Sequence, residues 1–202
     1  MTNITTLHPG EHFMLKGFEW VCLDPYHPDG GVLAIMDEPW AKDAKFCPSD
    51  NFIDERGNWN NYRTSNVRLI LSDMVNTVLD RESLLSHTVD LVADNGDRAY
   101  GTVQDSVFIL TCDEHRKYRD YIPHYDRWIW TATPWCCGDN DSDTGYALYV
   151  RYVDMGGKMY IGDAYRSGAV APACVLNPAA LNLRQSIAYV EDASDANTGL
   201  PR

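Results

Sequence analysis

The sequence predicts an α+β fold made of short twisted antiparallel strands, one main amphipathic helix and long irregular loops. Three observations lead to this class. Short aromatic and β-branched runs are separated by clusters of Gly, Pro, Asp and Asn, a pattern typical of strands joined by turns. Residues 65–80 repeat apolar side chains at helical spacing. Residues 128–176 again read as strands and loops, so a doubly wound parallel sheet would contradict this prediction.

The length of the chain favours one domain. A chain of 202 residues with 45% hydrophobic content can bury most of its apolar surface in a single core. We expect the domain to span residues 1–178. The remaining segment, residues 179–202, is polar, and we expect a C-terminal tail that is either an arm on a partner or disordered.

Residues 17–38 predict a β-hairpin with a long loop. An aromatic and β-branched run is followed by a loop with two prolines and two glycines, and then the apolar run resumes. Residues 37–65 are rich in Asp, Asn, Pro and Gly and are expected to be irregular. Aromatic side chains usually fix such a loop to the core, and five occur here: Trp40, Phe46, Phe52, Trp59 and Tyr62.

The clearest helix begins near Thr64 or Ser65, because a hydroxyl at this position can cap the free backbone amides of the first turn. Its apolar residues recur at helical spacing as far as Asp80, with polar residues mainly on the other side. The helix is therefore expected to be amphipathic and to pack on a sheet. Its core-facing residues are Val67, Ile70, Leu71, Met74 and Val78.

The middle of the chain predicts two strands and a short helix. Residues 86–93 form the first expected strand, and the apolar run 107–112 forms the second. Residues 113–118 are expected to form a helix directly after it.

The C-terminal part predicts strands joined by polar loops. A strand at 128–134 is followed by an Asp/Asn/Gly loop and a second strand at 146–153. A Gly156-Gly157 turn then leads to a last buried strand at 169–176.

The cysteines do not form a recognisable redox or zinc motif. No Cys-x-x-Cys pair occurs among the six. Cys22, Cys112 and Cys174 lie in apolar runs and are expected to be buried in strands. Cys136 and Cys137 follow a Trp in a turn, where they can be exposed and reactive, either as two free thiols or as a strained vicinal disulfide.

The composition of the chain limits the kinds of partner that we expect. A net charge of −12 without a basic run argues against nucleic-acid binding, which requires clustered Lys and Arg. No stretch approaches the roughly 18 apolar residues of a membrane span, so membrane insertion is not expected. The first 20 residues lack the apolar run of a signal peptide. We expect the protein to be made in the cytoplasm, and a virion or cell-surface location fits the same features.

Catalytic motifs are absent from the sequence. No nucleophile elbow, phosphate loop, HExxH or dinucleotide motif occurs, and the six histidines are dispersed, most of them in polar loops where a solvated ring is the default. We therefore predict that the protein is not an enzyme and needs no cofactor. The acids of residues 139–145 could bind calcium weakly, but the Gly and Glu positions of an EF-hand are not reproduced, so no metal site is predicted.

The segment 135–166 favours a binding surface. Tyr, Asp, Asn and Arg provide large contact area and adaptable hydrogen bonds, as they do in antibody paratopes. Positions 147, 148, 150 and 153 are expected to point inward. The alternative is that the tyrosines only cover the core. The candidate binding residues are Trp135, Asp139, Asn140, Asp141, Asp143, Tyr146, Tyr149, Arg151, Tyr152, Tyr160, Asp163, Tyr165 and Arg166.

Five weak motifs occur in the order found in one protein family. A Trp before a helix that opens on x-Leu-Arg is matched by Trp59 and residues 66–69, and an Asp-x-Val-Phe-Leu-Leu-Ser-x-x-Glu motif is matched by residues 105–114. The family then has a Trp-rich strand ending in Pro, a Tyr-Val strand, a Gly turn and a Gly-Val-Arg-Pro-Ala-Leu strand. These are matched by residues 128–134, 149–150, 156–157 and 169–173.

Through these motifs, residues 17–178 resemble a family of bacterial and phage domains. The resemblance implies a C-type-lectin-like fold, related in architecture to the formylglycine-generating enzymes. Two family arginines are missing, since Thr131 or Ala132 and Ala171 occupy their places, so no ligand is carried over. The binding segment also resembles the variable region of proteins that retroelements diversify in phages and bacteria.

These observations favour a non-catalytic recognition module that displays residues 135–166 to a protein or glycan receptor on a cell surface. One alternative is a virion structural or decoration subunit that uses the same surface to contact its neighbours or to form a homo-oligomer. A cytoplasmic inhibitor of a host enzyme also fits the acidity, although no residue singles it out.

Overall fold

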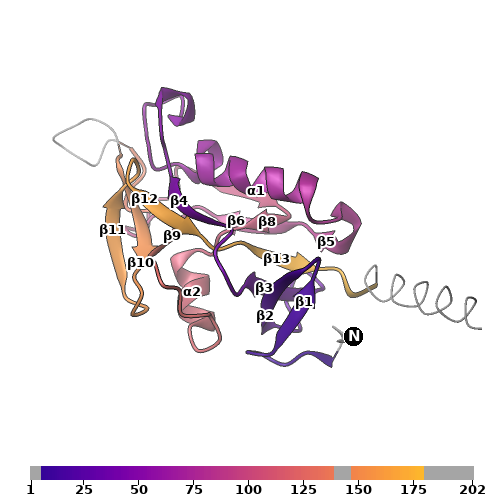
Figure 1. Ribbon diagram of the computed structural model, residues 1–202. Helices are drawn as coiled ribbons and strands as arrows, with labels where there is room; N and C mark the ends of the chain where they lie inside the picture. The colour runs from indigo at the N-terminus through magenta and orange to yellow at the C-terminus, as the bar shows by residue number, and fades with distance from the viewer. Residues whose placement is uncertain (1–5, 139–146, 180–202) are drawn as a thin grey trace, which may run out of the picture.

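The computed structural model describes residues 6–138 and 147–179, and it has an α+β architecture (Figure 1). The class predicted from the sequence is confirmed. Two α-helices and three β-sheets occur in the described residues. The strands are β1 (His12–Leu15), β2 (Phe18–Asp24), β3 (Val32–Met36), β4 (Ala41–Lys45), β5 (Leu84–Leu85), β6 (His87–Asp90), β7 (Thr102–Asp105), β8 (Val107–Phe108), β9 (Ile129–Pro134), β10 (Tyr149–Val153), β11 (Met159–Asp163), β12 (Ser167–Val170) and β13 (Ala173–Leu176).

The first sheet has the strand order β1-β2-β3-β13-β5, and β8 also pairs with β13. Its β2–β3 hairpin is the one that the sequence predicts, with Trp20 opposite Met36. Every residue of β3 and β13 is buried, which explains why these strands read as continuous apolar runs.

The second sheet has the order β11-β10-β9-β12-β4, and β11 forms the left edge of the molecule in Figure 1. The predicted final strand at 169–176 is divided between the two sheets. β12 pairs antiparallel with β4 but parallel with β9, which departs from the predicted antiparallel strands, whereas β13 pairs antiparallel with β3. Pro172, between them, lacks an amide hydrogen and cannot continue a ladder as a donor. The short strand β11 was not predicted.

The predicted irregular segment 37–65 contains one strand, β4, which pairs with β12. Its Ala-Lys-Asp-Ala-Lys sequence has low β-propensity, so tertiary pairing and not local preference forms it. The expected role of the aromatic residues is confirmed. Phe46 and Tyr62 are fully buried, and Trp40, Phe52 and Trp59 pack against the core.

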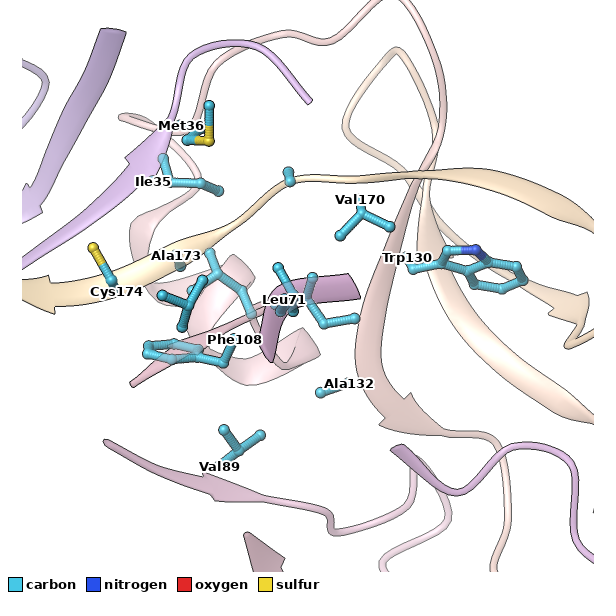
Figure 2. Packing of buried hydrophobic residues seen from close by; sticks show 14 of the residues in the cluster. Ile35, Met36, Leu71, Val89, Phe108, Trp130, Ala132, Val170, Ala173 and Cys174 are labelled. Atoms are coloured by element: carbon cyan, nitrogen blue, oxygen red, sulfur yellow. The ribbon is translucent and has the colours of Figure 1, made fainter. Parts of the chain in front are cut away.

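The main helix, α1 (Asn66–Thr77), begins where the sequence predicts and ends about one turn earlier. The Ser65 hydroxyl accepts a hydrogen bond from the amide of Arg68, which caps the first turn. The residues buried on α1 are Val67, Leu71, Met74 and Val75, whereas Ile70 and Val78 are only partly buried. Leu71 lies near Phe108, Val170 and Ala173 in the core (Figure 2).

The predicted strand at 107–112 is shorter than expected, because Thr111 begins a helix. Its hydroxyl accepts a hydrogen bond from the Glu114 amide, and the Glu114 carboxylate accepts one from the Thr111 amide in return. This capping box starts α2 (Cys112–Tyr118), the predicted short helix. The predicted strand at 86–93 corresponds to β6, which pairs with β7 in a separate two-stranded sheet.

No helix in the two described ranges is both long enough and apolar enough to cross a membrane. Of the predicted C-terminal tail, only its first residue, Ala179, lies inside the described residues.

Candidate functional site

The predicted binding segment begins at the end of β9 and includes β10 and β11. β10 and β11 pair antiparallel, with Tyr149 opposite Asp163 and Tyr152 opposite Tyr160. The expected inward positions are confirmed for Ala147, Val150 and Val153, which are buried, whereas Leu148 is partly buried.

Arg151 and Tyr152 do not belong to one surface, because successive side chains of a strand point to opposite faces of the sheet. The Arg151 guanidinium lies 3.4 Å from the Asp94 carboxylate and 5.6 Å from the centre of the Trp135 ring, and only 16% of the side chain is exposed. Tyr152 instead packs against Trp128 and stacks on Tyr160. The three partly buried residues 149, 151 and 152 therefore cannot act as one patch.

Two buried asparagines hold the described residues on either side of the segment 139–146. The Asn60 amide donates to the carbonyls of Cys136 (2.9 Å) and Tyr149 (2.8 Å), and its oxygen accepts from the Tyr100 hydroxyl. The Asn58 oxygen accepts a hydrogen bond from the Ala147 amide at 3.0 Å. The end of β9 and the start of β10 are thus fixed by side-chain hydrogen bonds. Sequence reasoning missed this role, because asparagine in a loop reads as a turn residue.

The pair Cys136 and Cys137 is buried, which corrects the expectation that it is exposed and reactive. Neither thiol is part of a disulfide, and desolvation by burial raises the pKa of Cys137 to about 11. A thiol with a raised pKa carries little reactive thiolate at neutral pH. Cys22 and Cys174 are buried in strands as predicted, whereas Cys112 is buried at the start of α2.

The exposed part of the predicted surface is aromatic. Trp135, Tyr160 and Tyr165 are 40%, 44% and 49% exposed. Arg166 is exposed and forms an ion pair with Asp163 at 2.8 Å. The predicted residues Asp139, Asn140, Asp141, Asp143 and Tyr146, together with the weak calcium site, lie outside the described residues.

A hollow of about 510 Å³, lined in part by charged side chains, adjoins Arg151 through Asp94. The Asp94 amide donates to the carbonyl of Pro134, so the wall of the hollow is joined to the residue before Trp135. Arg116 lies 3.7 Å from Asp94 on the same wall. The charged side chains of the hollow are Asp90, Asp94, Arg98, Asp113, Glu114 and Arg116.

A second group of polar side chains lies where the β2–β3 loop meets β6 and α2. His87 Nδ1 is 2.7 Å from the Asp29 carboxylate, and its Nε2 is 2.9 Å from the Glu114 carboxylate. His27 Nδ1 lies 3.3 Å from the same oxygen of Asp29. Both histidine rings are buried, and so is His115 on α2, which corrects the expectation of solvated rings for these three, whereas His8, His12 and His124 are exposed.

The electrostatics of this group depend on burial and on the two carboxylates. Desolvation lowers the pKa of His27. For His87, desolvation is opposed by its contacts with Glu114 and Asp29, and the pKa is raised. Burial of Glu114 is opposed by its contacts with His87 and Thr111, and its pKa is lowered. No sequence pattern indicates this group, because Asp29 and His87 are 58 positions apart.

Two histidine and carboxylate groups in the described residues are close enough to hold a metal ion. They are His27, Asp29 and His87, and the more exposed His12, Glu19 and Asp37.

No protein-family model, curated protein or solved structure matches this chain.

Proposed function

We propose that the chain is a non-catalytic recognition module with a C-type-lectin-like fold, from a phage or a bacterium, that binds a protein or glycan on a cell surface. The binding surface is formed by Trp135 and by the exposed aromatic residues of β11 and the turn after it. The observation that carries the proposal is that these aromatic side chains are exposed on a framework held by buried hydrogen bonds.

The rigid backbone around Trp135 supports the proposed binding function. Asn60 joins the carbonyl of Cys136, the residue after Trp135, to that of Tyr149, which also accepts the Trp135 amide, so the backbone at Trp135 has little freedom to lose on binding. Arg151 also lies against the Trp135 ring. Large aromatic side chains with few rotatable bonds are typical of residues that contribute most to a binding energy.

The hollow is joined to Trp135 through Asp94 and Arg151, and it extends the proposed surface. It offers both carboxylates and guanidinium groups for hydrogen bonds to hydroxyls or amides of a ligand. An aromatic ring beside such polar groups fits a sugar or a peptide, which both present apolar and hydrogen-bonding surfaces.

A binding experiment tests the proposal. Labelled protein is applied to a glycan array and to intact bacterial cells, and Trp135→Ala and Tyr165→Ala are compared with Tyr26→Ala. Tyr26 is 85% exposed in the β2–β3 loop, so it is a control for the loss of one exposed aromatic side chain. We expect binding to be lost in the first two variants and kept in the control. Equal binding by all three variants, or no saturable binding by the natural chain, would overturn the proposal.

The alternative is an assembly function, in which the same region contacts neighbouring subunits in a virion or a homo-oligomer. Among the described residues β11 is the edge strand of its sheet, and Tyr160 and Ile161 on it are 44% and 41% exposed. Free strand edges with apolar side chains pair readily with other chains. Sedimentation of the natural chain and of Ile161→Lys distinguishes the two functions, since only assembly predicts an oligomer that the lysine disrupts.

We further propose that the surface is diversified by a retroelement. This idea rests on the clustering of Tyr, Asp and Asn between residues 135 and 166. An adjacent near-repeat of the end of the gene, next to a reverse transcriptase, is the expected finding. A genomic locus without either one would contradict it.

A further inference from the structure

We propose that His27, Asp29 and His87 form a binding site for a divalent transition metal ion, with Zn²⁺ as the best fit, and that Glu114 holds His87 in the ligating tautomer. Two imidazole nitrogens and one carboxylate oxygen are a ligand set that zinc and its neighbours prefer. The three ligand residues lie outside the hollow and away from Trp135, and only Glu114 also lines the hollow, so the metal site stands whether or not the Trp135 surface binds a receptor.

The ligand atoms already lie close together. Asp29 Oδ2 is 2.7 Å from His87 Nδ1 and 3.3 Å from His27 Nδ1, and all three atoms lie within 4.8 Å of one another. Tetrahedral ligands at the usual zinc distances are about 3.4 Å apart, so small side-chain rotations would bring the three atoms to a common ion. The Asp29 carboxylate is 29% exposed, which leaves a path from solvent.

The backbone of the β2–β3 loop turns two of the ligands toward the third. The His27 amide donates to the Gly31 carbonyl, and the Gly30 amide donates to the His27 carbonyl. Gly30 has a positive φ of 88°, which a residue with a side chain rarely adopts. The Asp29 amide also points at His27 Nδ1, at 3.4 Å, which is long for a hydrogen bond.

Glu114 supplies the outer interaction expected of a metal-bound histidine. It lies 2.9 Å from Nε2 of His87, on the side of the ring opposite Asp29. The Nε2–H is not aligned with this carboxylate for a hydrogen bond, and a small ring rotation would align it. A proton on Nε2 leaves Nδ1 with a free lone pair for an ion. Glu114 is itself held by the amide and the hydroxyl of Thr111, at 2.8 and 2.7 Å. The ring of His87 is further fixed by stacking on Phe108, with 4.2 Å between ring centres.

The competing possibility is that His87 carries two protons and pairs with both carboxylates, without a metal. The two possibilities differ in the proton on Nδ1, which an ion would displace. They also differ in the role of His27. A metal requires His27 as a ligand, whereas a protonated His87 gains nothing from a second imidazole at its side.

The test uses the full chain without a histidine tag, titrated with Zn²⁺ alone by calorimetry and with Co²⁺ alone by visible absorption. We expect one equivalent of Zn²⁺ to bind and the Co²⁺ complex to show the intense absorption of a low-coordinate site. We also expect Zn²⁺ to raise the melting temperature. No saturable binding of either ion would overturn the proposal.

Substitutions of the proposed ligand residues identify which side chains bind the ion. His27→Gln and Asp29→Asn are expected to abolish binding. Glu114→Gln is expected to weaken it about 10- to 100-fold, as outer-shell changes do. His12→Ala is the matched control, because His12 belongs to the exposed group with similar ligand types, and it should leave binding unchanged. Because Asp29 is exposed in a loop, its variant should remain folded, which circular dichroism checks. Loss of binding in His12→Ala, or full binding by Asp29→Asn, would overturn the assignment.

Discussion

The two histidine and carboxylate groups of this protein have similar chemistry and different surroundings. In the first, His12 lies 3.0 Å from Glu19 and 3.7 Å from Asp37, with about half of the His12 and Glu19 side chains exposed. In the second, His87 contacts Asp29 and Glu114 at 2.7 and 2.9 Å, and only 10% of its side chain is exposed.

The difference indicates that burial, and not the distance between charges, decides how much such a group contributes to the free energy of unfolding. Water screens an exposed pair and competes for each of its hydrogen bonds, so its net contribution is small. A buried pair has exchanged water for its partners, and removal of one partner leaves the other without compensation. The following predictions use this contrast, and they begin with the largest effect.

His87→Ala is expected to lower the free energy of unfolding by about 3 kcal/mol or more, because it leaves Asp29 and Glu114 unpaired and removes the ring that stacks on Phe108. His12→Ala should change it by about 0.5 kcal/mol or less. Urea unfolding of both variants in the presence of EDTA measures the difference. Equal effects of the two substitutions would contradict the role assigned to burial.

His115 is a buried histidine that contacts no carboxylate in the described residues, and it should behave in the opposite way to His87. Desolvation, together with Arg119 and Arg116, lowers the pKa of His115 from 6.5 to about 4. Its stabilising effect is therefore complete above pH 6.5 and is lost as the pH falls toward 4. We expect a loss of about 2.5 kcal/mol by pH 4.5.

His115→Gln is the variant that isolates this effect. Other titrating groups are common to both proteins, so the difference in unfolding free energy between them should shrink in acid. Urea unfolding at pH 7 and pH 4.5 gives the four values needed. A difference that stays constant between the two pH values would mean that His115 is not the responsible group.

Much of the fold follows from local sequence patterns. The β2–β3 hairpin, the Ser65 cap of α1 and the short helix α2 were all predictable, because turn residues, helical spacing and capping residues act over a few positions. Strand β4 was not, since its charged sequence becomes a strand only by pairing with β12. The division of the last strand between two sheets likewise depends on contacts that are distant in sequence.

The candidate site was less predictable for the same reason. The exposure of Trp135, Tyr160 and Tyr165 agrees with the predicted surface. The contacts that position this surface come from elsewhere in the chain, since Asn60 reaches Tyr149 across 89 positions. The group around His87 also unites three separate segments. Residue type indicated which side chains can bind, but not which of them are brought together.

Two helix caps allow the same comparison of exposed and buried interactions, with smaller expected effects on stability. Thr111 and Ser65 both cap a helix, but Thr111 also holds Glu114, the partner of His87. Ser65→Ala is expected to cost about 1 kcal/mol. Thr111→Ala should cost more, toward about 2 kcal/mol, because it also loosens a buried carboxylate. Thermal melts of both variants test the order, and a larger loss for Ser65→Ala would contradict it.

The smallest effect on stability is expected for the exposed pair of His12 and Glu19. Glu19→Gln should change the free energy of unfolding by about 0.5 kcal/mol or less, and 1 M salt should remove even that change, since the charges are open to solvent. A double-mutant cycle with His12→Ala measures the coupling of the pair directly. The matching cycle of His87→Ala with Glu114→Gln should give a larger coupling that salt leaves nearly intact, because Glu114 is largely shielded from the solvent ions. If both couplings disappeared in salt, the His87 group would be an exposed pair in solution, and the difference in burial on which the comparison rests would fail.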